Sequence, residues 1–300
     1  MQPAYHKSIM SREVLTYLRP KPGQIFVDCT IGCGGHAEKI LKAIKPNGRL
    51  IGIDQDLEAL KICEQRLGDY KANLILVHDN FENLDNILSR NAIKGVNGIL
   101  FDLGLSSLQI ESKSRGFSFQ LNAPLDMRMD QTKRITAFDL INNLTEDEIA
   151  RIIKNLGEER WARRIAKEIV KERKKTPIIT TFQFANLVSR IVPFSSKSKI
   201  HPATRTFQAF RIVVNREIEA LEQGLQKAIE FLKHSARICV ISFHSLEDRT
   251  VKKIYRREAH HHKIKILTKK PLLAAEQEVL ENPRSRSAKL RVAERNGELK

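Results

Sequence analysis

The residues best suited to chemistry in this chain lie where an apolar run meets a glycine-rich turn, at positions 27–36 (VDCTIGCGGH). Glycine lets the backbone take a positive φ and approach a ligand closely, and a helix that follows offers free N–H groups in its first turn. Gly34, Gly35 and His36 are therefore candidate ligand contacts. The same glycine pattern also fits a buried turn without a ligand, so further evidence is needed.

An acidic residue, Asp54, ends the next apolar run at about the distance from the turn that nucleotide-binding α/β folds show. In those folds an acid at this place accepts hydrogen bonds from ribose hydroxyls. The alternative is a cap for the following helix, a role that Asp56 could also fill. The turn and the acid together favour a bound nucleotide-like ligand. A dinucleotide and S-adenosylmethionine share this arrangement, and the glycine pattern does not separate them.

Short apolar runs recur along the first hundred residues and are bounded by Gly, Asp or Asn. They predict four strands, at Ile25–Asp28, Leu50–Asp54, Leu74–His78 and Ile99–Leu103. Apolar steps of three and four residues from Leu57 to Leu67 predict an amphipathic helix between the second and third strands. Repeated βαβ units predict an α/β fold with a parallel, doubly wound sheet.

The strand pattern stops after Leu103, and a long loop runs to about Asp130. Loops of this length are usually functional or disordered. Thr145 with Glu148, and Thr180 with Gln183, are capping boxes that predict two helices. We therefore expect an inserted α-helical domain over residues 109–206 that recognises the substrate, with 1–108 and 207–300 forming the sheet domain.

Three further elements follow the insert. Apolar residues step by three and four from Phe207 to Leu232, which predicts one long helix packed on the sheet. Arg237–Phe243 is apolar enough to be a strand that returns to the sheet, and Lys289–Val292 alternates in the manner of an edge strand.

The chain carries 52 Lys and Arg against 35 Asp and Glu, a formal net charge of +17. This excess favours a polyanionic partner, and nucleic acid is the strongest candidate. The sequence has no run of 18 apolar residues and no signal-peptide pattern, so we expect no membrane association.

Cysteine and histidine give no sign of a metal site. The four cysteines are Cys29, Cys33, Cys63 and Cys239, which lie in or beside apolar runs without CxxC pairing, so reduced thiols are expected. His260–His262 stand among Lys and Arg and are expected to be solvated rather than to bind a metal.

Seven motifs occur in register along the chain. They are Asp28–His36, Asp102–Gln109, Arg115–Phe119, Pro124–Asp130, His201–Ala209, Ile241–Arg249 and Asn282–Ser287. Together they resemble the ribosomal RNA small subunit methyltransferase H family, also called MraW. The chain departs from the family pattern at Asn122-Ala123 and at Cys33, where we expect only a small effect on turn geometry.

The resemblance implies a class I (Rossmann-like) methyltransferase in the cytoplasm. It implies transfer of a methyl group from S-adenosylmethionine to N4 of a cytidine in the decoding region of 16S rRNA. By this likeness the cofactor contacts are Gly34, Gly35, His36, Asp54 beside the ribose, Phe81 beside the adenine, and Asp102 with Gln109 near the methionine end. For Phe81 an ordinary place in the core is the alternative.

Amine methyltransferases commonly place an acid or amide followed by two prolines and an aromatic residue after the fourth strand, and here Asp102-Leu103-Gly104-Leu105 stands there. The missing aromatic means that a cytosine must stack on another ring. We expect Asp102 to orient the methyl donor or accept the amine proton. The stacking candidates are Phe117, Phe119 and Phe243, and the alternative proton acceptors are His244 and Asp248.

Four arginines are candidate contacts for RNA phosphates, namely Arg115, Arg128, Arg205 and Arg211. Salt bridges to Asp126, Asp130 or Glu217 are the alternative for them. Two other functions stay open on the residues alone. These are an rRNA-binding assembly factor without catalysis and an NAD-dependent oxidoreductase. The sequence also leaves open a homodimer and whether naked rRNA or the assembled subunit is the substrate.

Overall fold

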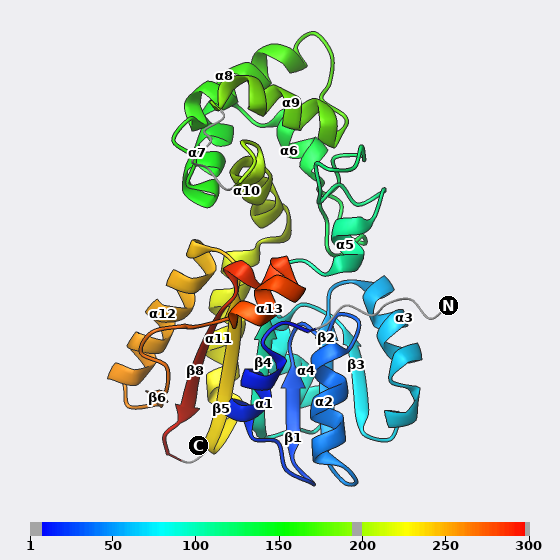
Figure 1. Ribbon diagram of the computed structural model, residues 1–300, viewed down its shortest axis with the longest axis vertical. Helices are drawn as coiled ribbons and strands as arrows, with labels where there is room; N and C mark the ends of the chain where they lie inside the picture. Colours follow the sequence, from blue (N-terminus) through cyan, green and yellow to red (C-terminus); the bar gives the residue numbers. More distant parts are fainter. Residues whose placement is uncertain (1–7, 194–199, 298–300) are drawn as a thin grey trace. The chain divides into compact units, whose positions relative to one another are not determined.

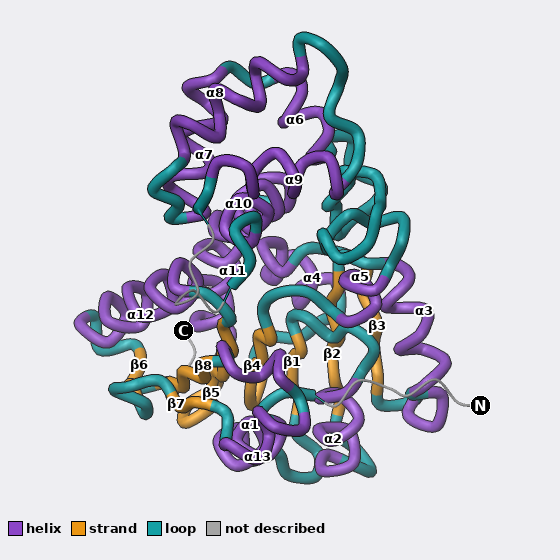
Figure 2. The backbone as a smooth tube through the Cα atoms, turned by 45° about the horizontal axis from the view of Figure 1, so that its top comes forward, coloured by secondary structure: helices purple, strands orange, loops and turns teal. Residues whose placement is uncertain are grey.

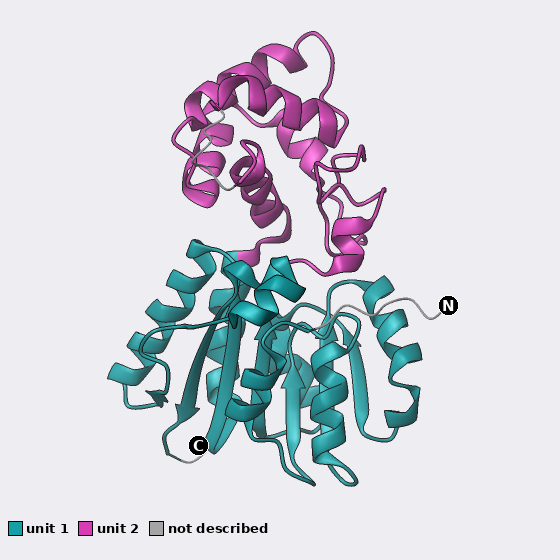
Figure 3. Cartoon of the chain, in the orientation of Figure 1, with its two compact units in different colours: residues 1–104, 218–300 teal, residues 105–217 magenta. Residues whose placement is uncertain are grey.

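The structure is a computed structural model that describes residues 8–193 and 200–297. The chain forms two compact units (Figure 3), one made of residues 1–104 with 218–300 and the other of residues 105–217. The second unit interrupts the first in sequence, as expected of an insert. Its boundaries are wider than the expected 109–206, because the segment from Phe207 to Glu217 belongs to the helical unit.

The first unit is built on one eight-stranded sheet (Figure 1). Its strands are β1 (Ile25–Asp28), β2 (Arg49–Asp54), β3 (Leu74–His78), β4 (Val96–Asp102), β5 (Leu232–Ser242), β6 (Ile264–Ile266), β7 (Leu272–Leu273) and β8 (Lys289–Arg295). The order is β3-β2-β1-β4-β5-β8-β6, with β7 beside β8. The first five strands in this order are parallel, and β8 is antiparallel to both β5 and β6. The predicted parallel, doubly wound sheet is confirmed.

Helices cover both faces of this sheet (Figure 2). They are α1 (Ser11–Leu18), α2 (Gly35–Ile44), α3 (Leu57–Arg66), α4 (Leu84–Arg90), α11 (Glu217–Phe231), α12 (Ser245–His260) and α13 (Glu276–Glu281). Neighbouring residues of β1 point to opposite faces. Phe26 packs with residues of α1, α2 and α3, and Val27 packs with residues of α4, α11 and α12. The two buried faces explain why the strands are apolar throughout.

Two predictions for the end of the chain are wrong. Residues Phe207–Leu232 form two helices, because Arg216 takes a left-handed conformation (φ 52°) between α10 and α11. The spacing of the apolar residues continues across this break, so the break could not be predicted from the apolar pattern. Lys289–Val292 belongs to β8, which lies inside the sheet between β5 and β6 rather than at its edge.

The second unit is helical. Its helices are α5 (Ser107–Glu111), α6 (Ala137–Asn143), α7 (Glu146–Gly157), α8 (Ala162–Arg173), α9 (Thr181–Ile191) and α10 (Thr204–Asn215). The predicted capping boxes at Thr145 and Thr180 are present. Apolar side chains of α6 to α10 form a core of this unit's own. None of the described helices has the length and apolar character needed to cross a bilayer.

Candidate functional site

The order of the strands indicates a ligand site at the carboxyl ends of the strands. The chain runs from β1 outward to β3 on one side and then from β4 to β5 on the other, so the topology switches between β1 and β4. In open α/β sheets ligands bind at this point, beyond the carboxyl ends of the strands. Asp28 ends β1, Asp54 ends β2 and Asp102 ends β4, so three carboxylates lie at neighbouring strand ends.

The glycine turn joins β1 to α2 and has the conformation that only glycine adopts easily. Gly34 is the residue before α2 and has φ 83°, and Gly32 has φ 51°. The N–H of Gly32 donates to Oδ2 of Asp54 at 2.8 Å, so the acid at the end of β2 fixes the turn. Asp56 caps α3 by accepting from the N–H of Glu58 at 3.1 Å. The capping role is thus filled by Asp56, as the sequence suggested it could be.

The ends of β1 and β4 are tied together beside the turn. The N–H of Asp102 donates to Oγ1 of Thr30 at 2.7 Å, and the N–H of Thr30 donates to Oδ1 of Asp28 at 3.2 Å. His36, in the first turn of α2, places Nε2 at 3.4 Å from Oδ2 of Asp102. The structure therefore brings together Gly34, His36, Asp54 and Asp102, and their contact with a cofactor stays a prediction.

Two polar atoms at this place lack hydrogen-bond partners among the described residues. One is Nε2 of His36, a residue that is 6% exposed, and the other is Oδ1 of Asp102. Buried polar groups are almost always satisfied, so each such exception needs an explanation. A ligand with polar groups would supply these partners.

Burial changes the acidity of two carboxyls in the site. It raises the pKa of Asp28 to about 7, and the opposing effects of nearby His36 and of the hydrogen bond from Thr30 are smaller. It also raises the pKa of Asp54 to about 6, against hydrogen bonds from the backbone of Asp56 and Gly32. A carboxyl with a raised pKa in the folded state binds its proton more tightly than in the unfolded chain.

We expect Asp28→Asn to become more stable relative to the wild type as the pH rises from 5 to 7. In this range the unfolded carboxyl, with its ordinary pKa of 3.8, is ionised, whereas the native one with a pKa of about 7 still holds its proton over most of it. Unfolding of the wild type therefore releases a proton, so rising pH lowers its stability and leaves that of the amide variant unaffected by this group. The free energy of unfolding of the variant minus that of the wild type, measured with urea, should increase by about 2 kcal/mol over this range. A difference between the two proteins that does not change with pH would mean that the Asp28 pKa is ordinary.

Phe81 lies in the core of the sheet unit. Phe81 is 7% exposed, and its ring packs edge to face against that of Phe101, with the ring centroids 5.3 Å apart. A Cβ added to Gly224 would lie 2.7 Å from the Phe81 ring, so α11 passes close to it. This is the core position considered as the alternative for Phe81, and the contact with adenine stays a prediction.

Gln109 belongs to the helical unit, where it closes the capping box of α5. Its side-chain Oε1 accepts from the N–H of Ser106 at 3.1 Å, and its own N–H donates to Oγ of Ser106 at 3.2 Å. A role near the methionine end of a cofactor stays a prediction.

The expectation that Arg115 contacts RNA is corrected. The residue is 1% exposed, and its guanidinium donates to the carbonyl oxygens of Arg128 and Met129 at 3.0 and 2.8 Å. A guanidinium enclosed in this way holds the long loop together and cannot reach a phosphate while the loop is folded. The sequence could not show this, because its acceptors are main-chain atoms 13 and 14 residues away.

Two of the other arginines form the salt bridges given as the alternative, and one does not. Arg128 donates to both carboxylate oxygens of Asp126 at 2.8 and 2.6 Å. Arg211 does the same to Glu217 at 2.8 and 2.7 Å. Arg205 is exposed, and among the described residues its guanidinium donates only to the carbonyl oxygen of Glu158, at 3.3 Å. Arg205 is thus the most accessible of the four.

The alternative proton acceptors are occupied by neighbours. Asp248 forms a bidentate ion pair with the buried Arg291, whose guanidinium nitrogens donate to Oδ1 at 2.7 Å and to Oδ2 at 3.1 Å. His244 caps α12, its Nδ1 accepts from the N–H of Glu247 at 3.3 Å, and its Nε2 lies 3.0 Å from Oε1 of Glu247. Both side chains are therefore engaged by neighbouring residues. Of the three candidate proton acceptors, Asp102 is the one with a carboxylate oxygen that forms no hydrogen bond among the described residues.

The three stacking candidates differ in their surroundings. Phe117 is buried in the core of the helical unit. Phe119 is half-buried and stacks on His201 with centroids 4.5 Å apart. The ring of Phe243 lies against Gly104, just after β4, where an added Cβ would be 3.2 Å from the ring. Phe243 is thus placed beside the end of β4.

A basic face on α8 and the residue before Trp161 is a further candidate contact, one that the motif residues do not include. Ala162, Ile165, Ala166 and Ile169 bury one side of this helix. Arg160, Arg163, Arg164 and Lys167 are exposed. No ion pair of these four cations occurs among the described residues. The sequence signal for this face is a set of basic residues at helical spacing opposite an apolar stripe.

Trp161 holds part of this basic face in place. The guanidinium carbons of Arg164 and Arg160 lie 4.6 and 5.4 Å from the centroid of its indole ring. Cation–π contacts of this kind restrict long side chains without neutralising their charge. The cations of this face therefore remain available to an anionic partner.

Comparison with known proteins gives a match along nearly the whole chain. The MraW methylase family matches residues 3–296. Ribosomal RNA small subunit methyltransferase H of Halothermothrix orenii is 47% identical over 306 residues, which cover 97% of this chain and 98% of that protein. The protein of the same name in Persephonella marina is 48% identical over 291 residues, which cover 97% and 99%. Among solved structures, an rRNA methylase from Streptococcus thermophilus covers 96% of this chain and 94% of its own, at 12% identity and a TM-score of 0.46, too distant to bear on function.

The family match extends over both units and includes the turn after β1, the end of β4 and the start of α12. Relatives of nearly equal length share almost half of the residues. The chain therefore belongs to the MraW methylase family.

Proposed function

We propose that this protein transfers a methyl group from S-adenosylmethionine to N4 of a cytidine in the decoding region of small-subunit rRNA. The family and the name of its relatives, ribosomal RNA small subunit methyltransferase H, support the reaction class and the RNA. The target atom and the region follow from the motif resemblance. The net charge of +17 supports a polyanionic substrate.

The observation that carries the proposal is the group of carboxylates around the turn. Asp28, Asp54 and Asp102 end three neighbouring strands, and Nε2 of His36, which faces Oδ2 of Asp102, and Oδ1 of Asp102 form no hydrogen bond among the described residues. Acids at this place favour a cationic ligand that carries ribose hydroxyls. They would repel the pyrophosphate of a dinucleotide, so the NAD-dependent alternative fits the site less well.

The residues present fit S-adenosylmethionine, which supplies an electrophilic methyl group when bound. Gly34 and Gly35 would let the backbone approach it, and Asp54 would accept from the ribose hydroxyls. In the transfer, the cytosine nitrogen would form a bond to the methyl carbon while the sulfur–carbon bond breaks and its electron pair stays on sulfur. The nitrogen would then lose a proton to the carboxylate of Asp102 or to water. Oδ1 of Asp102 can accept a hydrogen bond from the amine and so orient it.

The basic face of α8 is the proposed contact of the helical unit with RNA. Arg163, Arg164 and Lys167 are exposed and form no ion pair among the described residues, whereas Arg115 is buried. Arg205 is the remaining candidate from the motifs.

Changing Arg163, Arg164 and Lys167 together to glutamine is expected to weaken RNA binding by about 10- to 100-fold at moderate salt. The slope of log K against log salt should fall by about 2 to 3, because each lost phosphate contact removes nearly one released counterion. Fluorescence anisotropy with a labelled rRNA fragment measures both. Lys171→Gln with Lys175→Gln is the matched control, because these lysines already pair with Glu168 and Glu172. Equal slopes for the triple variant and the wild type would exclude this face.

The proposed function is tested by incubating the purified protein with methyl-labelled S-adenosylmethionine and either naked small-subunit rRNA or small subunits from cells that lack this modification. Digestion to nucleosides should place the label in N4-methylcytidine. Label in another nucleoside would refute the target atom. RNA binding without any label would instead support the assembly factor.

A further inference from the structure

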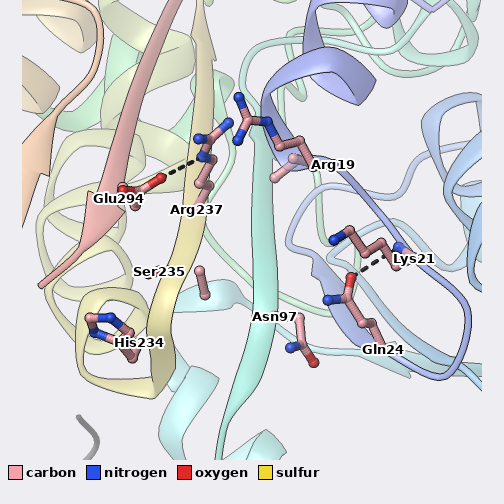
Figure 4. A pocket seen from close by; sticks show the side chains of 10 residues that line it. Arg19, Lys21, Gln24, Asn97, His234, Ser235, Arg237 and Glu294 are labelled. Atoms are coloured by element: carbon pink, nitrogen blue, oxygen red, sulfur yellow. Dashed lines mark hydrogen bonds and ion pairs between the residues drawn. The ribbon is translucent and has the colours of Figure 1, made fainter. Parts of the chain in front are cut away.

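A polar pocket opens at the amino-terminal edge of the sheet, opposite the carboxylate site (Figure 4). Its volume is about 490 Å³. Gln24 directly precedes β1, Asn97 is the second residue of β4, and Arg237 begins the regular pairing of β5 with β4. The pocket therefore lies at the starts of parallel strands, where the Rossmann-like arrangement does not place its ligand.

Several hydrogen-bond donors of the pocket lining are exposed and free to bind a ligand. Among the described residues, the exposed side chains of Arg19, Lys21, His234 and Ser235 form no hydrogen bond or ion pair. Asn97 uses its Oδ1 to accept from the N–H of Ile25 at 3.1 Å, which leaves its amide N–H donors.

The charge of the lining is positive. Its one carboxylate, Glu294, is neutralised by Arg237 at 2.8 Å, and Arg237 also donates to the carbonyl oxygen of Tyr17 at 2.9 Å. Arg19 and Lys21 are left without a counter-charge among the described residues. A cavity with many donors, two free cations and no free carboxylate fits an anion.

Two of the lining residues have a left-handed backbone, as do six other non-glycine residues among those described. Arg19 has φ 51° and Ser235 has φ 60°. Arg19 ends α1 at the position where glycine is usual, with its N–H bonded to the carbonyl oxygen of Leu15 at 2.9 Å. Glycine could therefore replace Arg19 without backbone strain.

We propose that this pocket binds phosphate groups, at a site separate from the one that holds the methyl donor. Arg19 and Lys21 supply charge, and Ser235, Asn97 and His234 supply neutral donors. The volume accommodates a phosphate with its sugar. The phosphate can come from the RNA backbone, as a second anchor for the substrate, or from a free phosphorylated molecule. The first source rests on the proposed function, and the second does not.

Arg19→Gly with Lys21→Gln is the variant that tests the pocket. Glycine removes the guanidinium and also the left-handed strain, so the variant should fold at least as well as the wild type. Lys61→Gln with Lys253→Gln is the control, because it removes two exposed charges of the same unit from α3 and α12, helices that contribute no residue to the pocket lining. Thermal unfolding checks that all three proteins are folded.

Calorimetric titration of the full chain with pyrophosphate at low salt is the first measurement. We expect the wild type and the control to bind it and the pocket variant to bind at least about tenfold more weakly. No binding by the wild type, or equal affinity for the pocket variant, would overturn the proposal.

The salt dependence of RNA binding then identifies the source of the phosphate. A slope of log K against log salt that falls by about 1 to 2 in the pocket variant alone assigns the site to the RNA backbone. An unchanged slope together with lost pyrophosphate binding assigns it to a free phosphorylated molecule. Should the wild type bind no RNA, the proposed function fails, and the pyrophosphate titration still decides the pocket.

Discussion

Asp102→Ala is expected to lower the rate of methyl transfer by about 10²- to 10⁴-fold and to leave the fold intact. The carboxylate ends β4 at the switch point of the sheet, and its Oδ1 has no partner among the described residues. The tie between β1 and β4 uses the N–H of Asp102 and not its side chain, so alanine preserves it. Single-turnover transfer from labelled S-adenosylmethionine measures the effect.

Asp69→Ala is the control for this experiment, because Asp69 is an exposed acid of the same unit outside the site. Comparing the dissociation constant of S-adenosylmethionine with the rate separates two roles for Asp102. A slower reaction at unchanged affinity indicates contact with the amine, and weaker affinity indicates contact with the donor. A turnover near that of the wild type would remove Asp102 from the reaction.

Gly34→Ala is expected to weaken the binding of S-adenosylmethionine by at least about tenfold and to destabilise the protein by about 1 to 3 kcal/mol. Gly34 has φ 83°, and an added Cβ would lie 2.9 Å from Cδ1 of Leu67 and 3.0 Å from Sγ of Cys63. The turn must therefore shift, and its backbone N–H groups move with it. The increase in melting temperature caused by saturating S-adenosylmethionine measures the remaining affinity.

Gly68→Ala is the matched control for Gly34→Ala, since a Cβ at Gly68 meets nothing within 4 Å and the residue has no positive φ. It should respond to the ligand as the wild type does. A Gly34→Ala variant that folds and keeps the full ligand-induced increase would show that the turn does not bind the donor.

The sheet was predictable because local patterns determine it. The bounds of β1 and β3 agree with the apolar runs, whereas β2 and β4 begin one and three residues earlier. The place of β8 inside the sheet was not predictable, because an alternating strand looks the same at an edge or beside two partners.

The other differences from the sequence predictions also arise from contacts between residues far apart in the chain. The break at Arg216 is fixed from a distance, because the side chain of Asn215 bonds the main chain of Met127 and Met129, both at 2.7 Å. An apolar period cannot reveal such contacts. In the site, the glycine turn and the acids that end β1, β2 and β4 were visible in sequence, whereas the burial of Arg115 and the free cations of α8 depend on tertiary packing.

Binding of S-adenosylmethionine by the turn between β1 and α2 underlies the proposed reaction. It is measured by titrating the purified, folded wild-type chain with this compound in a calorimeter. We expect one site per chain that also binds S-adenosylhomocysteine and is weakened by the Gly34→Ala change. If neither compound produces heat while circular dichroism shows a folded protein, the turn does not bind the methyl donor.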